Sequence, residues 1–200
     1  MLRRNAVFVL VALVVPLASL APPAQAQVHV EGHTYAARAR VAGQDIVLNG
    51  TGVRAVAWLK GFSAGLYLPA KAASADGVVA MAGPKRLQMR MLQEVPAAEF
   101  AKAVDKGIGR NTPAAEQPAL DERRAVFDRQ ILALGTVRKG DVVDLDFVPG
   151  TGLVMALNGR LHGAPVAGED FYGAVLRIFL GERPVDARLK AGLLGRRAAP

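Results

Sequence analysis

Apolar and polar residues alternate along several short stretches of the chain, which is the pattern of a β-strand that buries one face. In one such stretch, Asp144 and Asp146 occupy the polar side and are expected to face solvent. Asn158-Gly159 is the clearest two-residue hairpin turn in the chain. The strand-like stretches are residues 34–41, 44–50, 53–68, 85–93, 142–147 and 153–157.

Four segments have helical signals: apolar residues recur at intervals of three and four over 120–134, as on a helix with one buried face, and the other three are marked by residues typical of helix starts and stops. Asp170 is positioned to cap the third of these segments, and Gly135 and Gly181 are typical helix stops. Together the elements predict one α+β domain, in which an antiparallel sheet of about six or seven strands carries a layer of helices. The predicted helices cover residues 96–104, 120–134, 170–180 and 184–194.

The first 26 residues have the composition of a secretory signal peptide. Two arginines precede an apolar run over 6–21, and Ala24-Gln25-Ala26 offers the small residues that a signal peptidase recognises. A retained membrane anchor is the alternative, but the run is shorter than the ~20 residues of a span, and Pro16 interrupts it. We therefore predict cleavage after Ala26, a periplasmic location and one domain over residues 27–200. No later stretch is apolar enough to span a membrane.

The net charge is +8, and this basic excess favours anionic partners in general. The basic residues are interleaved with acidic ones and not with aromatic ones, so nucleic-acid binding is not predicted. The chain has no cysteine, which excludes disulfides and thiolate chemistry. His29, His33 and His162 lack a metal-ligand spacing, and no catalytic triad or phosphate-binding loop stands out, so neither a metal nor a cofactor is predicted.

One segment places polar groups inside a stretch that is otherwise apolar. Arg54 follows the glycines of LNGTGVR, and Ser63 and Tyr67 lie in the strand-like run after it. Burying an unpaired guanidinium is costly, so Arg54 requires either an acidic residue such as Asp45 or the anionic group of a ligand. Arg54 and Ser63 converge only if a bulge near Gly61 intervenes, because a regular strand would place them on opposite faces.

Two motifs resemble those of the chalcone isomerase-like superfamily, in particular its bacterial secreted branch. They are LNGTGVR followed by KGFSAGLYLP, and ALNGRLHGAPVAGEDFYGAVLRIFLGERPVDARLKAGLLG, and the resemblance extends over residues 28–195. It implies an open-faced β-sandwich, in which a large antiparallel sheet carries helices on one face and a cleft between the layers holds the ligand. The superfamily contains plant enzymes that cyclise chalcones, fatty-acid binders, and proteins with no settled activity.

The resemblance also implies roles for individual residues. Arg54 matches the arginine that holds an anionic oxygen in both the enzymes and the fatty-acid binders, and Ser63 matches a hydroxyl that positions a water in the enzymes. Phe100 stands where both groups carry a tyrosine, Gly107 where the enzymes carry an asparagine, and Tyr172 near their late serine or threonine. Since neither a phenylalanine nor a glycine side chain can form a hydrogen bond, we do not expect chalcone cyclisation.

We therefore expect a periplasmic, non-catalytic binder of a fatty acid or similar anionic amphiphile, with Arg54, Ser63, Tyr67, Phe100 and Tyr172 as its ligand-binding residues. One alternative is an isomerase or intramolecular lyase for an enolisable or phenolic substrate, in which Arg54 stabilises the developing charge and Tyr172 donates a proton. The other is an envelope interaction module with a vestigial cleft, filled by its own side chains, in which Arg54 pairs with an acidic residue. The identity of the ligand and the oligomeric state stay open.

Overall fold

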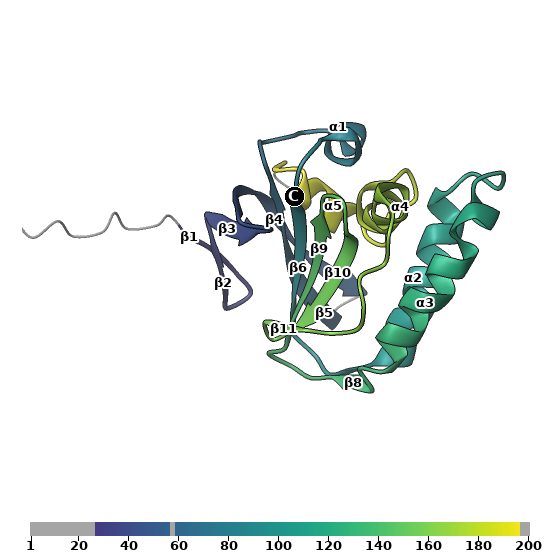
Figure 1. The fold of residues 1–200 in the computed structure, drawn as a ribbon. Coiled ribbons are helices and arrows are strands. Elements are labelled where there is room, and N and C mark those ends of the chain that lie inside the picture. Colours follow the sequence, from purple (N-terminus) through teal and green to yellow (C-terminus); the bar gives the residue numbers. More distant parts are fainter. Residues whose placement is uncertain (1–26, 57–58, 197–200) are drawn as a thin grey trace, which may run out of the picture.

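A computed structural model describes residues 27–56 and 59–196, which form an antiparallel sheet with helices on one face (Figure 1). Seven strands make up the sheet in the order β11-β10-β9-β6-β5-β4-β3, in agreement with the predicted number. The predicted signal peptide lies outside the described residues. The strands are β3 (Arg38–Val41), β4 (Gln44–Val56), β5 (Leu59–Leu68), β6 (Lys85–Met91), β9 (Val142–Val148), β10 (Gly152–Leu157) and β11 (Arg160–Leu161).

The central strand β6 shows the alternation that predicted it. Leu87, Met89 and Met91 are buried on the helix-facing side, whereas Arg86 and Arg90 lie on the other side and are half-buried. The sheet therefore has an apolar face under the helices and a second face with polar side chains. The site described below depends on which of these two faces each strand residue occupies.

The N-terminal strands β1 (Gln27–Val30) and β2 (His33–Ala36) form a separate hairpin. The predicted single strand over 34–41 is wrong, because the chain bends at Ala37 and β2 leaves the sheet while β3 stays in it. Tyr35 packs against the sheet face away from the helices, in a cluster with Ile46, Leu48 and Tyr67. A Cβ atom at Gly65 would lie 2.7 Å from the Tyr35 ring, so glycine is needed there for the ring to lie against the sheet.

The three longest helices lie on the other face of the sheet (Figure 1), together with the short helix near the end of the described chain, which packs on β4. Helix α4 (Glu169–Leu180) packs on β10, α2 (Ala97–Asn111) packs on α4, and α3 (Asp121–Leu132) packs on α2. All residues of α4 from Phe171 onward are buried except Arg177, which suits a helix enclosed on several sides. The shorter elements are α1 (Ala75–Ala80), η1 (Gln117–Leu120), α5 (Ala187–Leu193), β7 (Val95–Pro96) and β8 (Thr136–Val137).

The structure moves three predicted helix boundaries. Helix α2 continues through two glycines to Asn111 instead of ending near residue 104. Helix α4 is capped by Gly168, and the predicted cap Asp170 lies in the first turn, where it accepts hydrogen bonds from Arg123. Helix α5 begins after Asp186, whose carboxylate accepts two backbone N–H groups, and not at residue 184. Among the described residues, no helix has both the length and the apolar character needed to cross a bilayer.

Candidate functional site: an apolar cavity with an arginine

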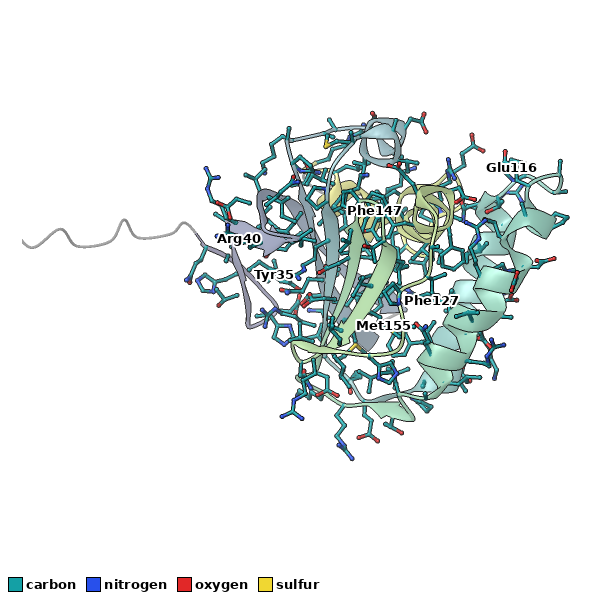
Figure 2. All side chains as sticks on the ribbon, in the orientation of Figure 1. Tyr35, Arg40, Glu116, Phe127, Phe147 and Met155 are labelled. Atoms are coloured by element: carbon teal, nitrogen blue, oxygen red, sulfur yellow. The ribbon has the colours of Figure 1, made fainter. Side chains whose placement is uncertain are left out.

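A cavity of about 580 Å³ lies between the sheet and the helices α2, α3 and α4. This volume falls within the range of roughly 300–1,000 Å³ that is typical of sites for small molecules. Figure 2 shows two of the lining residues, Phe127 and Met155, between the sheet and the α2–α3 pair. The lining is mainly apolar and includes Phe62 of β5, Met89 of β6, Met155 of β10, Phe100 of α2, Phe127 of α3 and Ile178 of α4.

Arg54 lies near the end of β4 and contributes a cation to this lining. It pairs with Phe62 in β5, and the register of the two strands shifts between Arg54 and Ala55. One guanidinium nitrogen donates to the carbonyl of Ala55 at 2.7 Å. Among the described residues Arg54 forms no ion pair, and Asp45 lies opposite Arg40 in β3. Most of the five N–H donors of a guanidinium therefore have no protein partner in the described part of the chain.

Two further residues that the sequence analysis singled out, Phe100 and Gly107, lie on α2. Phe100 is half-buried and lines the cavity with its aromatic ring. Gly107 is buried where α2 meets α4, and a Cβ atom there would lie 2.7 Å from Ile178 Cγ2. Neither residue has a side chain that can form a hydrogen bond, so neither can hold a ligand by a polar side-chain contact.

Ser63 and Tyr67 lie on the opposite face of the sheet from the cavity. Ser63 pairs with Val53 and not with Arg54, so the bulge does not bring the serine and the arginine together. The Ser63 hydroxyl is fully buried and forms hydrogen bonds with Tyr35 Oη at 2.8 Å and His33 Nδ1 at 2.9 Å. Tyr67 packs beside Tyr35, and burial raises the pKa of each tyrosine to about 12. The expected convergence of Arg54 and Ser63 is therefore wrong.

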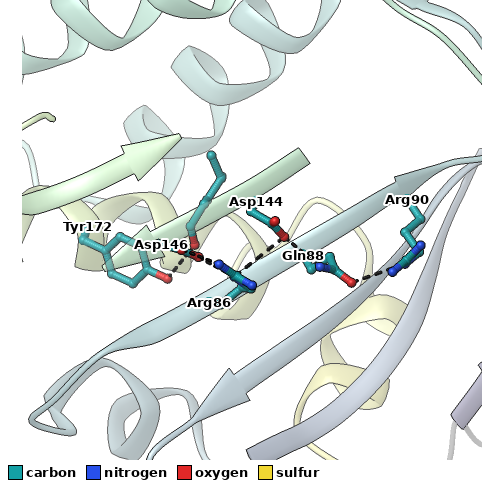
Figure 3. A network of polar contacts seen from close by, with 7 residues as sticks. Arg86, Gln88, Arg90, Asp144, Asp146 and Tyr172 are labelled. Carbon is teal, nitrogen blue, oxygen red and sulfur yellow. Dashed lines mark hydrogen bonds and ion pairs between the residues drawn. The ribbon is translucent and has the colours of Figure 1, made fainter. Parts of the chain in front are cut away.

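Tyr172 lies in α4 and is fully buried outside the cavity lining. Its hydroxyl donates to the backbone carbonyl of Leu145 at 3.1 Å (Figure 3). Its ring packs on Phe147 with centroids 5.3 Å apart. Burial raises the pKa of Tyr172 well above its usual range. The phenol is thus bonded to the sheet and does not face a molecule held at Arg54, which removes the proton donor assumed for the isomerase alternative.

A buried polar network occupies the sheet face away from the helices (Figure 3). Two nitrogens of Arg86 donate to the two carboxylate oxygens of Asp146 at 2.6 Å, and Gln88 donates to Asp144 at 2.8 Å. The expectation that Asp144 and Asp146 face solvent is wrong: Asp144 is only 7% exposed, because that face also carries the cluster around Tyr35. Burial raises the pKa of Asp146, and the Arg86 guanidinium opposes this effect.

The histidines also serve in local contacts. His33 bonds to Ser63, and His162 Nε2 lies 2.9 Å from the carbonyl oxygen of Gln130. Within residues 27–56 and 59–196, no three side chains of the metal-binding types converge.

Comparisons with known proteins agree with this architecture. A family model described as chalcone isomerase-like matches residues 27–195. The search of curated proteins gives no match. Among solved structures, a fatty-acid binding protein of Arabidopsis thaliana is similar, with a TM-score of 0.62 and 16% sequence identity over 84% of this chain and 96% of that chain. At this identity the likeness shows the fold alone, and the predicted fold of a large antiparallel sheet with a helical layer is confirmed.

Proposed function

Because the chain belongs to the chalcone isomerase-like family, we propose that it is a non-catalytic binder of a fatty acid or similar long-chain carboxylate. The observation that carries the proposal is an apolar cavity of about 580 Å³ whose lining includes the guanidinium of Arg54. The similarity in fold to a fatty-acid binding protein supports the same function. We also propose that the protein acts in the periplasm, which is supported by the signal-peptide composition of residues 1–26.

The two parts of the cavity suit the two parts of such a ligand. Each methylene that leaves water for the apolar lining contributes about 0.8 kcal/mol. The planar guanidinium can hold a carboxylate through two parallel N–H···O bonds, and these charge-assisted bonds are stronger than neutral ones. The carboxylate in turn supplies the counter-charge that Arg54 lacks among the described residues.

The two alternatives receive less support from the geometry. Arg54 and Glu99 are the ionisable side chains among the described residues that line the cavity, and the exposed Glu99 carboxylate pairs with Lys102 at 2.9 Å. An isomerase would require a proton donor beside the ligand, and Tyr172 does not occupy that position. A vestigial cleft would be filled by side chains and would pair Arg54 with an acidic residue, and the described part of the chain has neither feature.

Calorimetric titration with saturated fatty acids and the matching primary alcohols tests the proposal. We expect the acids to bind more tightly than the alcohols, and the affinity to rise roughly fourfold per methylene until the cavity is full. Arg54→Ala should weaken acid binding about 10- to 100-fold, because it removes charge-assisted hydrogen bonds, and should leave alcohol binding unchanged. Arg54→Lys should retain part of the acid preference, because it keeps the charge without the planar fork.

Arg40→Ala provides the matched control, since Arg40 is exposed on the edge strand β3. It removes the same charge far from the cavity lining and should not change the affinity for either ligand. Equal acid affinities in the wild type and Arg54→Ala, or no binding by the wild type, would contradict the proposed function.

A further inference from the structure

The loops at the Arg54 end of the sheet are connected by a series of hydrogen bonds. Arg54 and Gly61 both line the cavity, and the Gly61 carbonyl accepts a bond from Leu92 N at 2.9 Å. Met91, which precedes Leu92, forms two backbone hydrogen bonds with the loop 138–141: its N–H donates to the Asp141 carbonyl, and its carbonyl accepts from Gly140 N. The side chain of Asn158 then joins that loop to the β10–β11 turn, because it bonds to the backbone of Val142 and to the carboxylate of Asp141.

Five exposed residues from these loops and from the adjacent end of α3 form a surface that we call the basic rim: Leu132, Arg138, Lys139, Arg160 and Leu161. Two connections bring the end of α3 close to β11. His162 Nε2 lies 2.9 Å from the Gln130 carbonyl, and Gln130 Nε2 donates to the carbonyl of Ala164 at 2.7 Å. In Figure 1, β8 and β11 accordingly lie at the same lower end of the molecule.

The basic rim combines apolar and cationic side chains, and both are available to a partner. Leu161 is 78% exposed and Leu132 is 46% exposed, and with Val28 they are the large exposed hydrophobic residues of the described chain. Arg138, Lys139 and Arg160 form no ion pair within the described residues.

Two acidic residues near the rim, Asp141 and Glu94, offset part of its charge and leave the three cations in excess. The Asp141 carboxylate is engaged by Asn158 Nδ2 and by the backbone N–H of Arg138. Glu94, next to β7, adds one exposed negative charge. Exposed apolar side chains beside several cations are the combination that binds to the interface of an anionic bilayer.

We propose that the basic rim docks on the headgroups of an anionic lipid bilayer, and that the protein exchanges its amphiphile with the membrane in this orientation. The inference rests on the proposed function, because a long-chain carboxylate partitions into bilayers and must leave one to reach the cavity. Docking through the rim brings the Arg54 end of the sheet to the headgroup layer, where the carboxylate of the amphiphile lies. The cationic side chains attract the anionic lipids, and the two leucines enter the interface.

Co-sedimentation with vesicles tests the proposal, using phosphatidylcholine vesicles with and without phosphatidylglycerol at low salt. The protein is isolated from cells, and its N-terminus is checked by intact mass so that all variants are compared in the same form. We expect binding to the phosphatidylglycerol vesicles only. The triple variant Arg138→Glu, Lys139→Glu, Arg160→Glu should lower the partition coefficient more than tenfold, because each cation contributes about a fivefold gain near such a surface. Leu161→Ser should weaken the binding that remains at high salt.

The matched control is the triple variant Lys106→Glu, Arg110→Glu, Arg183→Glu, which makes the same change in net charge at exposed residues outside the rim. It should keep most of the vesicle binding, and an equal loss in both triple variants would overturn the proposal in favour of a net-charge effect. No wild-type binding to anionic vesicles would also overturn it.

Calorimetry with fatty acids in the absence of vesicles distinguishes a failure of membrane docking from a failure of the proposed function. Both triple variants should bind fatty acid as the wild type does, and Arg54→Ala should lose fatty acid while it keeps vesicle binding. If the wild type binds anionic vesicles but no fatty acid, it has no amphiphile to exchange with the membrane, and this result would contradict the inference.

Discussion

Arg54 reaches the cavity because it pairs with Phe62, and the two side chains therefore lie on the helix-facing side of the sheet. The adjacent pair, Val53 and Ser63, points to the other side. Since side chains alternate with a period of two, a shift of one residue would exchange these faces and remove the cation from the cavity. The register of a single strand pair thus separates a residue that can meet a ligand from one that belongs to a buried structural network.

The contacts of Ser63 predict that it contributes to stability and not to ligand binding. Ser63→Ala removes the hydrogen-bond partner of the buried Tyr35 hydroxyl and should lower the free energy of unfolding by about 1–3 kcal/mol. The double variant Tyr35→Phe, Ser63→Ala should recover part of this loss, because neither hydroxyl is then left unpaired. Denaturant unfolding measures the stability of the variants, and calorimetry measures their affinity for fatty acid. A tenfold loss of fatty-acid affinity in Ser63→Ala with unchanged stability would contradict the structural role of Ser63.

Lys85 predicts a dependence of stability on pH. Its side chain is 1% exposed, and its Nζ atom lies 3.6 Å from the Glu169 carboxylate and 4.8 Å from the centre of the Phe147 ring. Burial lowers the pKa of Lys85 below its usual 10.5, and the negative charge of Glu169 opposes this effect. Between the lowered pKa and 10.5 the unfolded chain binds more protons than the folded one, so the stability contributed by this residue rises with pH.

Lys85→Met removes the buried charge and leaves Glu169 exposed to water, so the variant should be more stable than the wild type at neutral pH. Because the penalty in the wild type is relieved on deprotonation, the difference in unfolding free energy should shrink as the pH approaches 10.5. Urea unfolding of both proteins across this range measures the difference. A difference that stays constant with pH would contradict the assignment.

At the scale of elements, the close packing of α2 on α4 helps to define the cavity. Gly107 allows the helices to approach at Ile178, and Ile178 itself lines the cavity. The sequence identified both helices from residues typical of helix starts but ended α2 too early, since glycine is a poor helix former and no neighbour is visible in a sequence. The helix is retained because tertiary contacts override the local preference.

Two glycines of α2 provide a matched pair of substitutions. Gly107→Ala should lower the free energy of unfolding by about 1–2 kcal/mol, because the new methyl group would lie 2.7 Å from Ile178 Cγ2. Gly109 has no neighbour within 4 Å of such a methyl group, so Gly109→Ala should raise it by up to about 1 kcal/mol through helix propensity. Thermal unfolding measures both variants, and equal effects of the same sign would show that helix packing at Gly107 is not tight.

At the scale of the whole molecule, the two faces of the sheet have different tasks. The helix-facing side carries the cavity, and the other side carries the ion pairs of Arg86 and the cluster around Tyr35. Alternation in the sequence predicted most strands, and two motifs predicted the family, which the match over residues 27–195 confirms. Alternation also predicted which residues of β9 share a face. It did not predict that the polar face is covered, so Asp144 was wrongly expected to face solvent.

The resemblance implied a cleft between the two layers, but which strand residues line it could not be predicted from the chain. Met89 and Leu87 have the same parity in β6, and only the first lines the cavity, because the outcome depends on which helix side chain lies above each residue. The same limit applies to Tyr172, whose bond to the Leu145 carbonyl depends on how α4 lies on the sheet. Parity therefore predicts the face of a strand residue, whereas an unfilled space depends on the packing of both layers.

Native mass spectrometry of the protein isolated from the cells that produce it tests the central claim most directly, with wild type and Arg54→Ala measured side by side. The account predicts that the wild type carries one acyl carboxylate, identifiable by its mass after release in the gas phase, and that the variant carries none or far less. Bare protein in both samples, even after fatty acids are added, or equal occupancy of the two proteins, would contradict the claim that Arg54 and the apolar cavity form a carboxylate-binding site.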